Sequence, residues 1–328
     1  MSSFKYNNVY IKDYHTIVGP KEKEGYIKFD DYIKDYYYEE ESIENAEIKM
    51  QNHVLNKVMI NNKLTSQNLD LITGGDLVDQ ISMTSYNLSN RKLPFLGLYN
   101  ACATFNESLI ILSNMIETNQ INNGIAITSS HNLNSERQYR FPIEYGFDKI
   151  PYATSTTTGA ACCLLTNKKT NIKIESSTIG TVVDYGIKDA SNMGAVMAPS
   201  AAETLHKHLT ELNRNINYYD LIVTGDLGEY GSRLFQKLIK EDYNYYPSTY
   251  VDAASILYDN EKEGIEGGSG PVVVPLILFN KILKENTYKR ILVLATGALH
   301  NPLMVNLKKS IPSITHAVSI EVIKWWFI

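Results

Sequence analysis

Residues 93–118 read LPFLGLYNACATFNESLIILSNMIET, and this stretch decides the fold class. Residues 93–98 are an apolar run with Pro94 near its start, which predicts a short, fully buried strand. Apolar residues then recur at helical spacing at Phe105, Leu109, Leu112 and Ile116. Because the predicted helix is apolar over most of its circumference, we expect it to lie centrally in the fold.

Cys102 lies in the turn that joins this predicted strand to this predicted helix. Unpaired amides and the positive end of the helix dipole at such a position favour a thiolate. We therefore expect Cys102 to contact a ligand or to act as a nucleophile. The alternative is a small buried residue that only packs, and its neighbours must decide between the two.

The composition is that of an ordinary globular protein and excludes several classes of function. The chain has 328 residues, of which 44% are hydrophobic and 20% charged, with a net charge of −5. Without a stripe of lysine and arginine, we expect no nucleic-acid partner. No apolar run approaches the roughly 20 residues of a membrane span, and the polar N-terminus shows no apolar signal segment.

The three cysteines, Cys102, Cys162 and Cys163, form neither a disulfide framework nor a metal-ligand spacing. This pattern predicts a reducing, cytosolic compartment. We expect no metal site and no cofactor from it. The histidines His15 and His53 lie in polar stretches without a recognisable context.

An internal repeat sets the domain organisation. Residues 69–77 (LDLITGGDL) match residues 219–227 (YDLIVTGDL) without a gap, 150 positions further along the chain. Weaker pairs relate residues 124–130 to 290–297, residues 160–165 to 315–320, and the helix after Cys102 to residues 270–278. Short apolar strands that alternate with helices indicate the α/β class. We therefore expect a duplicated five-layered αβαβα sandwich with mixed sheets and halves of 1–180 and 181–328.

Several motifs carry a resemblance to a known family. They include the turn Ala101–Thr104 and residues 18–25, together with the more specific stretches TSSHNLNSERQYRFPIEYG at 128–146 and MGAVMAPSAA at 193–202. The chain resembles the thiolase superfamily and, within it, the stage V sporulation protein AD family of endospore-forming bacteria. The similarity extends over nearly the whole chain.

The resemblance implies a thiolase fold, binding of dipicolinic acid, and a part in loading this small dianion into the developing spore. It also implies membrane proteins of the same operon as partners, and a soluble protein of the forespore cytoplasm that associates peripherally with the spore inner membrane. Since folds of this kind pair a sheet edge near the nucleophile, we expect a homodimer through residues 93–98 or their neighbours.

Two segments depart from the family pattern. Residues 26–42 are unusually rich in tyrosine and acid, and the chain ends in the apolar segment Ile323-Lys324-Trp325-Trp326-Phe327-Ile328. The tail either packs as a buried terminal strand or contacts a partner or membrane surface.

The resemblance also shows which catalytic partners are missing. Claisen-type chemistry needs donors for the enolate oxygen and a base besides the thiolate. Related condensing enzymes supply a histidine and an asparagine where this chain has Thr224–Leu227 and Glu266–Gly270. Asp226 would repel an oxyanion there. We therefore expect binding without catalysis; the alternative is an acyltransferase that uses Cys102 with His131 or His316 as base.

A dicarboxylate ligand requires fixed cations and donors. Arg137 and Arg140 stand three apart, as for a clamp on one helical face. The other expected ligand-binding residues are Ser129, Ser130, His131, Asn132 and His316, with Met193, Met197 and Phe141 as an apolar wall. The alternatives are a surface loop with neutralised arginines and, for His316, a core histidine. His206 and His208 are predicted to face the solvent.

Overall fold

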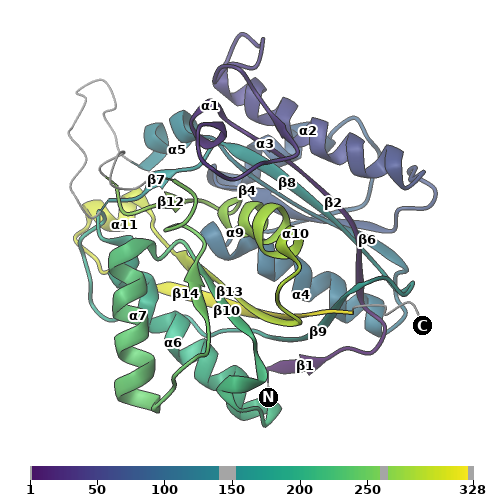
Figure 1. Ribbon diagram of the computed structural model, residues 1–328. Helices are drawn as coiled ribbons and strands as arrows, with labels where there is room; N and C mark the ends of the chain where they lie inside the picture. The colour runs from purple at the N-terminus through teal and green to yellow at the C-terminus, as the bar shows by residue number, and fades with distance from the viewer. Residues whose placement is uncertain (1, 140–152, 259–264, 324–328) are drawn as a thin grey trace.

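The computed structural model describes residues 2–139, 153–258 and 265–323 (Figure 1). Its main feature is a mixed, twelve-stranded sheet. Ten of these strands run from edge to edge in the order β5-β4-β6-β8-β2-β9-β14-β13-β10-β11, while β1 pairs with β9 and β3 with β2. β7 and β12 form a separate two-stranded sheet.

The ten strands form two groups of five with the same order. The first group is β5 (Phe95–Gly97), β4 (Leu71–Asp76), β6 (Asn123–Ser130), β8 (Gly159–Thr166) and β2 (Tyr10–Val18). The second group is β11 (Tyr250–Asp252), β10 (Leu221–Gly225), β13 (Arg290–Ala298), β14 (Ser313–Val322) and β9 (Ile172–Thr178). In both groups the two outer pairings are parallel and the other two antiparallel. The sequence repeat predicted that β4 is equivalent to β10, β6 to β13 and β8 to β14. The structure confirms this, because each strand holds the same place in its group.

The two groups are joined where β2 pairs with β9, so the sheet is continuous. β9 precedes the predicted division at residue 180, yet it pairs with β14 and takes the place in the second group that β2 has in the first. The short strands β1 (Ser3–Lys5), β3 (Asp31–Tyr32), β7 (Ser155–Thr156) and β12 (Gly268–Ser269) complete the strands.

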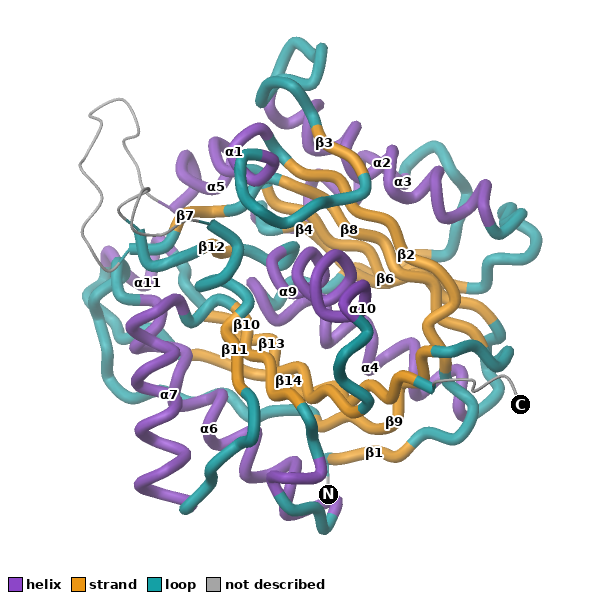
Figure 2. Tube along the Cα trace, in the orientation of Figure 1, coloured by secondary structure: helices purple, strands orange, loops and turns teal. Residues whose placement is uncertain are grey.

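Helices cover the outer face of each strand group, and further helices lie between the inner faces of the two groups (Figure 2). One outer face carries α2 (Ile43–Asn61) and α3 (Ser82–Leu88), and the other carries α6 (Met193–Leu212) and α7 (Gly228–Tyr243). Between the groups lie α4 (Thr104–Glu117), α9 (Val273–Ile277) and α10 (Leu283–Glu285). The short helices α1 (Pro20–Lys23), α5 (Asn132–Tyr139) and α11 (Pro302–Asn306) lie at the periphery.

Clusters of buried apolar side chains fill the layers. The largest joins α4 to α9 and the inner faces of both strand groups, with Phe105 and Phe279 fully buried. Two others lie beneath α2 and beneath α6 and α7, and a small one lies between α9 and the strands β2 and β8. This arrangement confirms that the helix after Cys102 is central. A polar tie adds to the packing, since Asn106 Nδ2 donates to the carbonyl oxygens of Val293 (2.9 Å) and His316 (2.8 Å).

The prediction of a fully buried strand at residues 93–98 is wrong. Among the described strands, β5 is the outermost of its group and pairs only with β4, and its Leu96 is 44% exposed. An apolar run cannot distinguish a buried strand from an edge strand, because both are short and rich in apolar residues. Pro94 fits an edge, where a missing donor matters least.

Within the described ranges, no helix is both long and apolar enough to cross a membrane. The predicted tail Trp325–Ile328 lies outside the described residues.

Candidate functional site

A cavity of about 210 Å³ lies beside Cys102, where the two halves of the repeat meet. The first half contributes Cys102 and the C-terminal part of α5, including Tyr139. The second half contributes Met193 and Met197 from α6, and Ser269 from β12. Ligand pockets in proteins are typically about 300–1,000 Å³, so this cavity suits a small ligand better than a long acyl chain.

Cys102 is presented by a strained turn. It stands in the 3₁₀ turn Ala101–Ala103, which runs directly into α4. Ala101 has a φ of 47°, in the left-handed region, and Asp226, which contacts Cys102, has a φ of 68°. Strained non-glycine residues concentrate at functional sites, where the surrounding structure over-determines them. The strained backbone at Ala101 and Asp226 therefore supports a functional role for the turn at Cys102.

The electrostatics oppose a thiolate, contrary to the prediction from the helix dipole. Burial raises the pKa of the Cys102 thiol well above its usual value, and the Asp226 carboxylate raises it further. Burial likewise raises the pKa of Asp226, although the thiol and the Gly270 amide hydrogen-bond to it. A helix N-terminus is a weak partial charge, so burial beside a carboxyl group outweighs it.

Asp226 is held in place by the second half of the chain. Its Oδ2 accepts a hydrogen bond from the Gly270 amide at 2.6 Å. Asp252 fixes the same loop, because its carboxylate accepts from the amides of Leu227 (3.2 Å) and Gly228 (3.1 Å). Burial raises the pKa of Asp252 to about 6. These hydrogen bonds therefore fix the Asp226 carboxyl group beside Cys102.

Aromatic and polar residues that sequence reasoning missed flank the cavity. Tyr139 donates to the Leu77 carbonyl at 2.9 Å and lies 2.8 Å from the Tyr99 hydroxyl, which donates to Asp79. The rings of Tyr139 and His300 meet edge to face at 5.2 Å. Tyr139 lies within the motif at 128–146, two residues beyond Arg137 on α5. Its position in this motif is the feature of the sequence that could have identified it as a site residue.

His316 lies close to the turn but does not line the cavity. Its Nε2 is 2.9 Å from Asn100 Nδ2, and its Nδ1 accepts from the Gly180 amide at 3.2 Å. Burial lowers the pKa of His316 to about 4, so the ring is neutral at physiological pH. The ring of His316 therefore lies against Asn100, beside the strained Ala101 turn. This placement corresponds to the alternative of a hydrogen-bonded core histidine.

The predicted donors at the end of β6 form hydrogen bonds with other residues of the protein interior. Ser129 donates to Glu47 at 2.7 Å and accepts from Gln51, while Ser130 donates to the Thr157 carbonyl at 2.7 Å. His131 Nε2 donates to the Tyr36 carbonyl at 2.9 Å, and burial lowers its pKa. Asn132 donates to the Thr156 carbonyl at 3.0 Å. Strand ends do collect polar groups, but here Ser130 and Asn132 bond the segment around β7, and Ser129 and His131 bond α2 and the segment before it.

The predicted arginine clamp is not assembled among the described residues. The Arg137 side chain is 59% exposed and pairs with Glu44 on α2 at 2.5 Å, outside the cavity lining. Arg140 and Phe141 lie outside the described residues. The predicted wall residues Met193 and Met197, in contrast, do line the cavity.

The prediction that His208 faces the solvent is wrong. His208 is fully buried and bonds the hydroxyls of Thr178 and Tyr219, both at 2.6 Å. His206 is half-buried and stacks on Tyr243 at 4.2 Å. The i, i+2 spacing showed that the two rings diverge, but not that α6 is buried on the side of His208.

Comparisons with known proteins agree with this architecture. Residues 2–321 match the family described as "Stage V sporulation protein AD (SpoVAD)". Stage V sporulation protein AD of Bacillus subtilis (strain 168) is 36% identical over 318 residues, which cover 95% of this chain and 94% of that protein.

Solved structures share the fold at low sequence identity. A variant of OleA from Xanthomonas campestris is 13% identical with a TM-score of 0.61, and the match covers 97% of this chain and 99% of that one. AbyA1, a tetronic acid condensing enzyme, is 11% identical with a TM-score of 0.59, at coverages of 95% and 99%. These likenesses establish a thiolase-like α/β fold with a mixed sheet. The match over residues 2–321 and the 36% identity show that the chain belongs to the stage V sporulation protein AD family.

Proposed function

We propose that this sporulation protein binds dipicolinic acid in the cavity beside Cys102, without acyl transfer, as part of the uptake of dipicolinate into the developing spore. The observation that carries the proposal is the pairing of Cys102 with Asp226. A buried thiol whose pKa is raised beside a carboxyl group is a poor nucleophile. The cavity therefore has a cysteine at the nucleophile position, but this cysteine is not activated for acyl transfer.

The lining of the cavity fits a flat, polar ring. Met193 and Met197 offer an apolar wall, and Tyr139 offers an aromatic ring nearby. The hydroxyls of Ser135 and Ser269 are neutral donors for carboxylate oxygens. Among the residues that the structure describes, no arginine or lysine lines the cavity and Glu136 does. Neutral donors would therefore have to hold the dianion close to a carboxyl group.

The location can be tested with a cavity-filling variant. Ala190 lines the cavity from the half-buried segment before α6 and packs at the edge of the cluster beneath α6 and α7. We expect Ala190→Trp to weaken dipicolinate binding by at least about tenfold, or about 1.4 kcal/mol, in isothermal titration calorimetry. Arg137→Ala, which removes an exposed surface pair, should leave the affinity within about twofold.

The opposite pattern would contradict this location. Loss of binding in Arg137→Ala, with full binding in Ala190→Trp, would place dipicolinate on the surface clamp predicted from the sequence. Circular dichroism and thermal unfolding of both variants show that a loss of binding is not a loss of fold.

The alternative function is acyl transfer through Cys102. It is favoured by the position of the thiol at the start of α4 within a cavity. Incubation with acyl-CoA thioesters of several lengths, followed by intact-mass measurement, separates the two functions. Binding without catalysis predicts no adduct; an acyl adduct that disappears in Cys102→Ser would establish the transferase.

We also propose that the protein is a homodimer through β5. This strand is an open edge of the sheet, and its Leu96 is 44% exposed. Unpaired strand edges invite pairing with a second copy. Leu96→Glu would place two like charges at an isologous contact, so light scattering should show twice the 37.1 kDa chain mass for wild type and a single chain mass for Leu96→Glu. Leu303→Glu, at an exposed residue of α11, is the control; a monomeric wild type would refute the dimer.

A further inference from the structure

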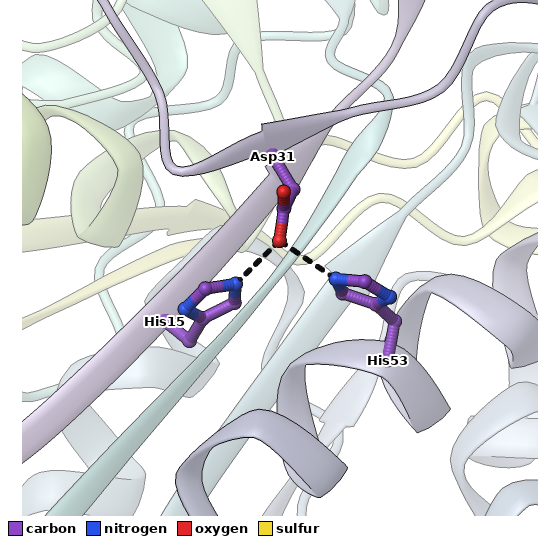
Figure 3. Close-up of side chains that lie close together, drawn as sticks. All are labelled: His15, Asp31 and His53. Carbon is purple, nitrogen blue, oxygen red and sulfur yellow. Dashed lines mark hydrogen bonds and ion pairs between the residues drawn. The ribbon is translucent and has the colours of Figure 1, made fainter. Parts of the chain in front are cut away.

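Three side chains outside the cavity at Cys102 converge on one point (Figure 3). His15 comes from β2, Asp31 from β3 and His53 from α2. Oδ2 of Asp31 lies 2.7 Å from Nε2 of His15 and 2.8 Å from Nε2 of His53. One carboxylate oxygen is thus shared by two imidazoles, and nothing in the proposed function uses this arrangement.

The fold, and not local spacing, brings these residues together. β3 pairs in parallel with the end of β2, with Ile17 opposite Asp31, which places Asp31 beside the strand that carries His15. α2 packs over β2 and β8 and supplies His53 from its middle. No metal-ligand spacing was therefore visible along the chain, and the expectation of no metal site rested on the cysteines alone.

We propose that His15, Asp31 and His53 bind a divalent transition-metal ion, with Zn²⁺ as the best fit. Two imidazoles and one carboxylate form a ligand set that zinc accepts, with one position left for water or an exogenous ligand. Calcium and magnesium prefer all-oxygen sites, so the two imidazoles select against them. The proposal is independent of dipicolinate binding.

The distances bring the three ligand atoms close to the spacing of a tetrahedral site, with the two contacts to Asp31 too short for it. The three ligand atoms all lie within 4.8 Å of one another. With zinc–ligand bonds of about 2.0–2.1 Å, a tetrahedral arrangement places ligand atoms about 3.3 Å apart. The contacts at 2.7 and 2.8 Å therefore have to open by about half an ångström. The metal would replace the protons that the two Nε2 atoms now direct at Asp31.

The surroundings provide an outer hydrogen bond and an approach from solvent. His53 Nδ1 lies 3.4 Å from the Tyr38 hydroxyl, a partner of the kind that orients metal-binding imidazoles. The side chains are partly accessible, at 15% for His15, 26% for His53 and 36% for Asp31. Asp31 also lines a cavity of about 380 Å³, together with Lys23 and Lys28.

The positive charge of Lys57 opposes binding of a cation at Asp31, and its removal provides a test. Lys57 follows His53 by one helical turn on α2, and its Nζ lies 4.0 Å from Asp31 Oδ2. A cation at this distance competes with a metal ion for the carboxylate. Lys57→Gln should therefore tighten metal binding, whereas a cluster that only ties β3 and α2 to β2 would bind no metal with or without Lys57.

The experiment uses the full chain without a histidine tag. Zn²⁺ is titrated in competition with a chromophoric chelator, and Co²⁺ is added separately to record its visible absorption. We expect one equivalent of Zn²⁺ and a Co²⁺ spectrum with the intense bands of tetrahedral coordination. His15→Gln and His53→Gln keep a hydrogen-bond donor towards Asp31 but remove the imidazole, and each should weaken binding by at least about tenfold. His206→Ala, a half-buried histidine of α6, is the matched control.

Two results would overturn the proposal. One is the absence of stoichiometric Zn²⁺ binding to the wild-type chain. The other is binding that is unchanged in folded His15→Gln and His53→Gln, which would place the ion elsewhere. Equal folding of the Gln variants and wild type, checked by thermal unfolding, keeps the comparison valid.

Discussion

Gly74→Ala is expected to destabilise the protein by about 3 kcal/mol or more. Gly74 lies in β4 with a φ of 135°, a region that only glycine adopts without strain of about 1–3 kcal/mol. A Cβ atom there would also lie 1.9 Å from the Ile127 carbonyl oxygen on β6. Because that obstacle is backbone, the pairing of β4 with β6 has to shift, which adds an overpacking cost of about 1–3 kcal/mol. Urea unfolding followed by circular dichroism measures the change.

Gly186→Ala is the matched control for Gly74→Ala. Gly186 also has a positive φ, of 75°, but a Cβ atom there meets nothing within 4 Å. Only the left-handed conformation is penalised, by about 1 kcal/mol. Equal losses in the two variants would show that the close approach of β4 to β6 is absent.

Asp226→Asn is expected to make Cys102 more reactive. The Asp226 carboxylate adds to burial in raising the pKa of the Cys102 thiol. Its replacement by a neutral amide lowers that pKa, and each unit raises the thiolate fraction about tenfold at a fixed pH below it. The rate of iodoacetamide alkylation, measured by mass spectrometry from about pH 7 to 10, should rise about tenfold or more. The pH midpoint should move down.

The control for Asp226→Asn is the double variant that also carries Cys102→Ser. Cys162 and Cys163 are buried in β8 and burial raises the pKa of both thiols, so they should contribute little alkylation. An unchanged rate in Asp226→Asn would mean that burial alone suppresses the thiol. In that case Asp226 would not explain why the Cys102 thiol is a poor nucleophile.

The fold was predictable because a repeat and a helical periodicity can both be recognised in the sequence itself. The match between residues 69–77 and 219–227 implied duplication, and the structure repeats it as β4 and β10 within two groups of equal strand order. Central α4 followed from apolar residues on most of its circumference. The edge position of β5 was not predictable, since which strand lies outermost depends on tertiary pairing.

The candidate site was only partly predictable. Cys102, Met193 and Met197 line the cavity as expected. Tyr139 and His300 were missed because they reach it from opposite halves of the chain. The predicted donors Ser129, Ser130 and Asn132 are polar residues at a strand end, but the structure uses them to bind the backbone and Glu47. Sequence shows which residues can bind a ligand, whereas burial and competing partners decide which of them are available.

The histidines illustrate the same limit. His15 and His53 had no context in the sequence, yet they meet at Asp31 through the pairing of β2 with β3 and the packing of α2. His316 was expected near a ligand, but it is neutral and bonded near the Cys102 turn.

The central claim is that the cavity beside Cys102 binds dipicolinate and performs no acyl transfer. A crystal structure of the protein soaked with dipicolinate tests it most directly. We predict the ring of the ligand within the cavity, beside Met193, Met197 and Tyr139, with the Cys102 sulfur unmodified. An empty cavity with dipicolinate bound at Arg137, or no bound dipicolinate at all, would contradict the account.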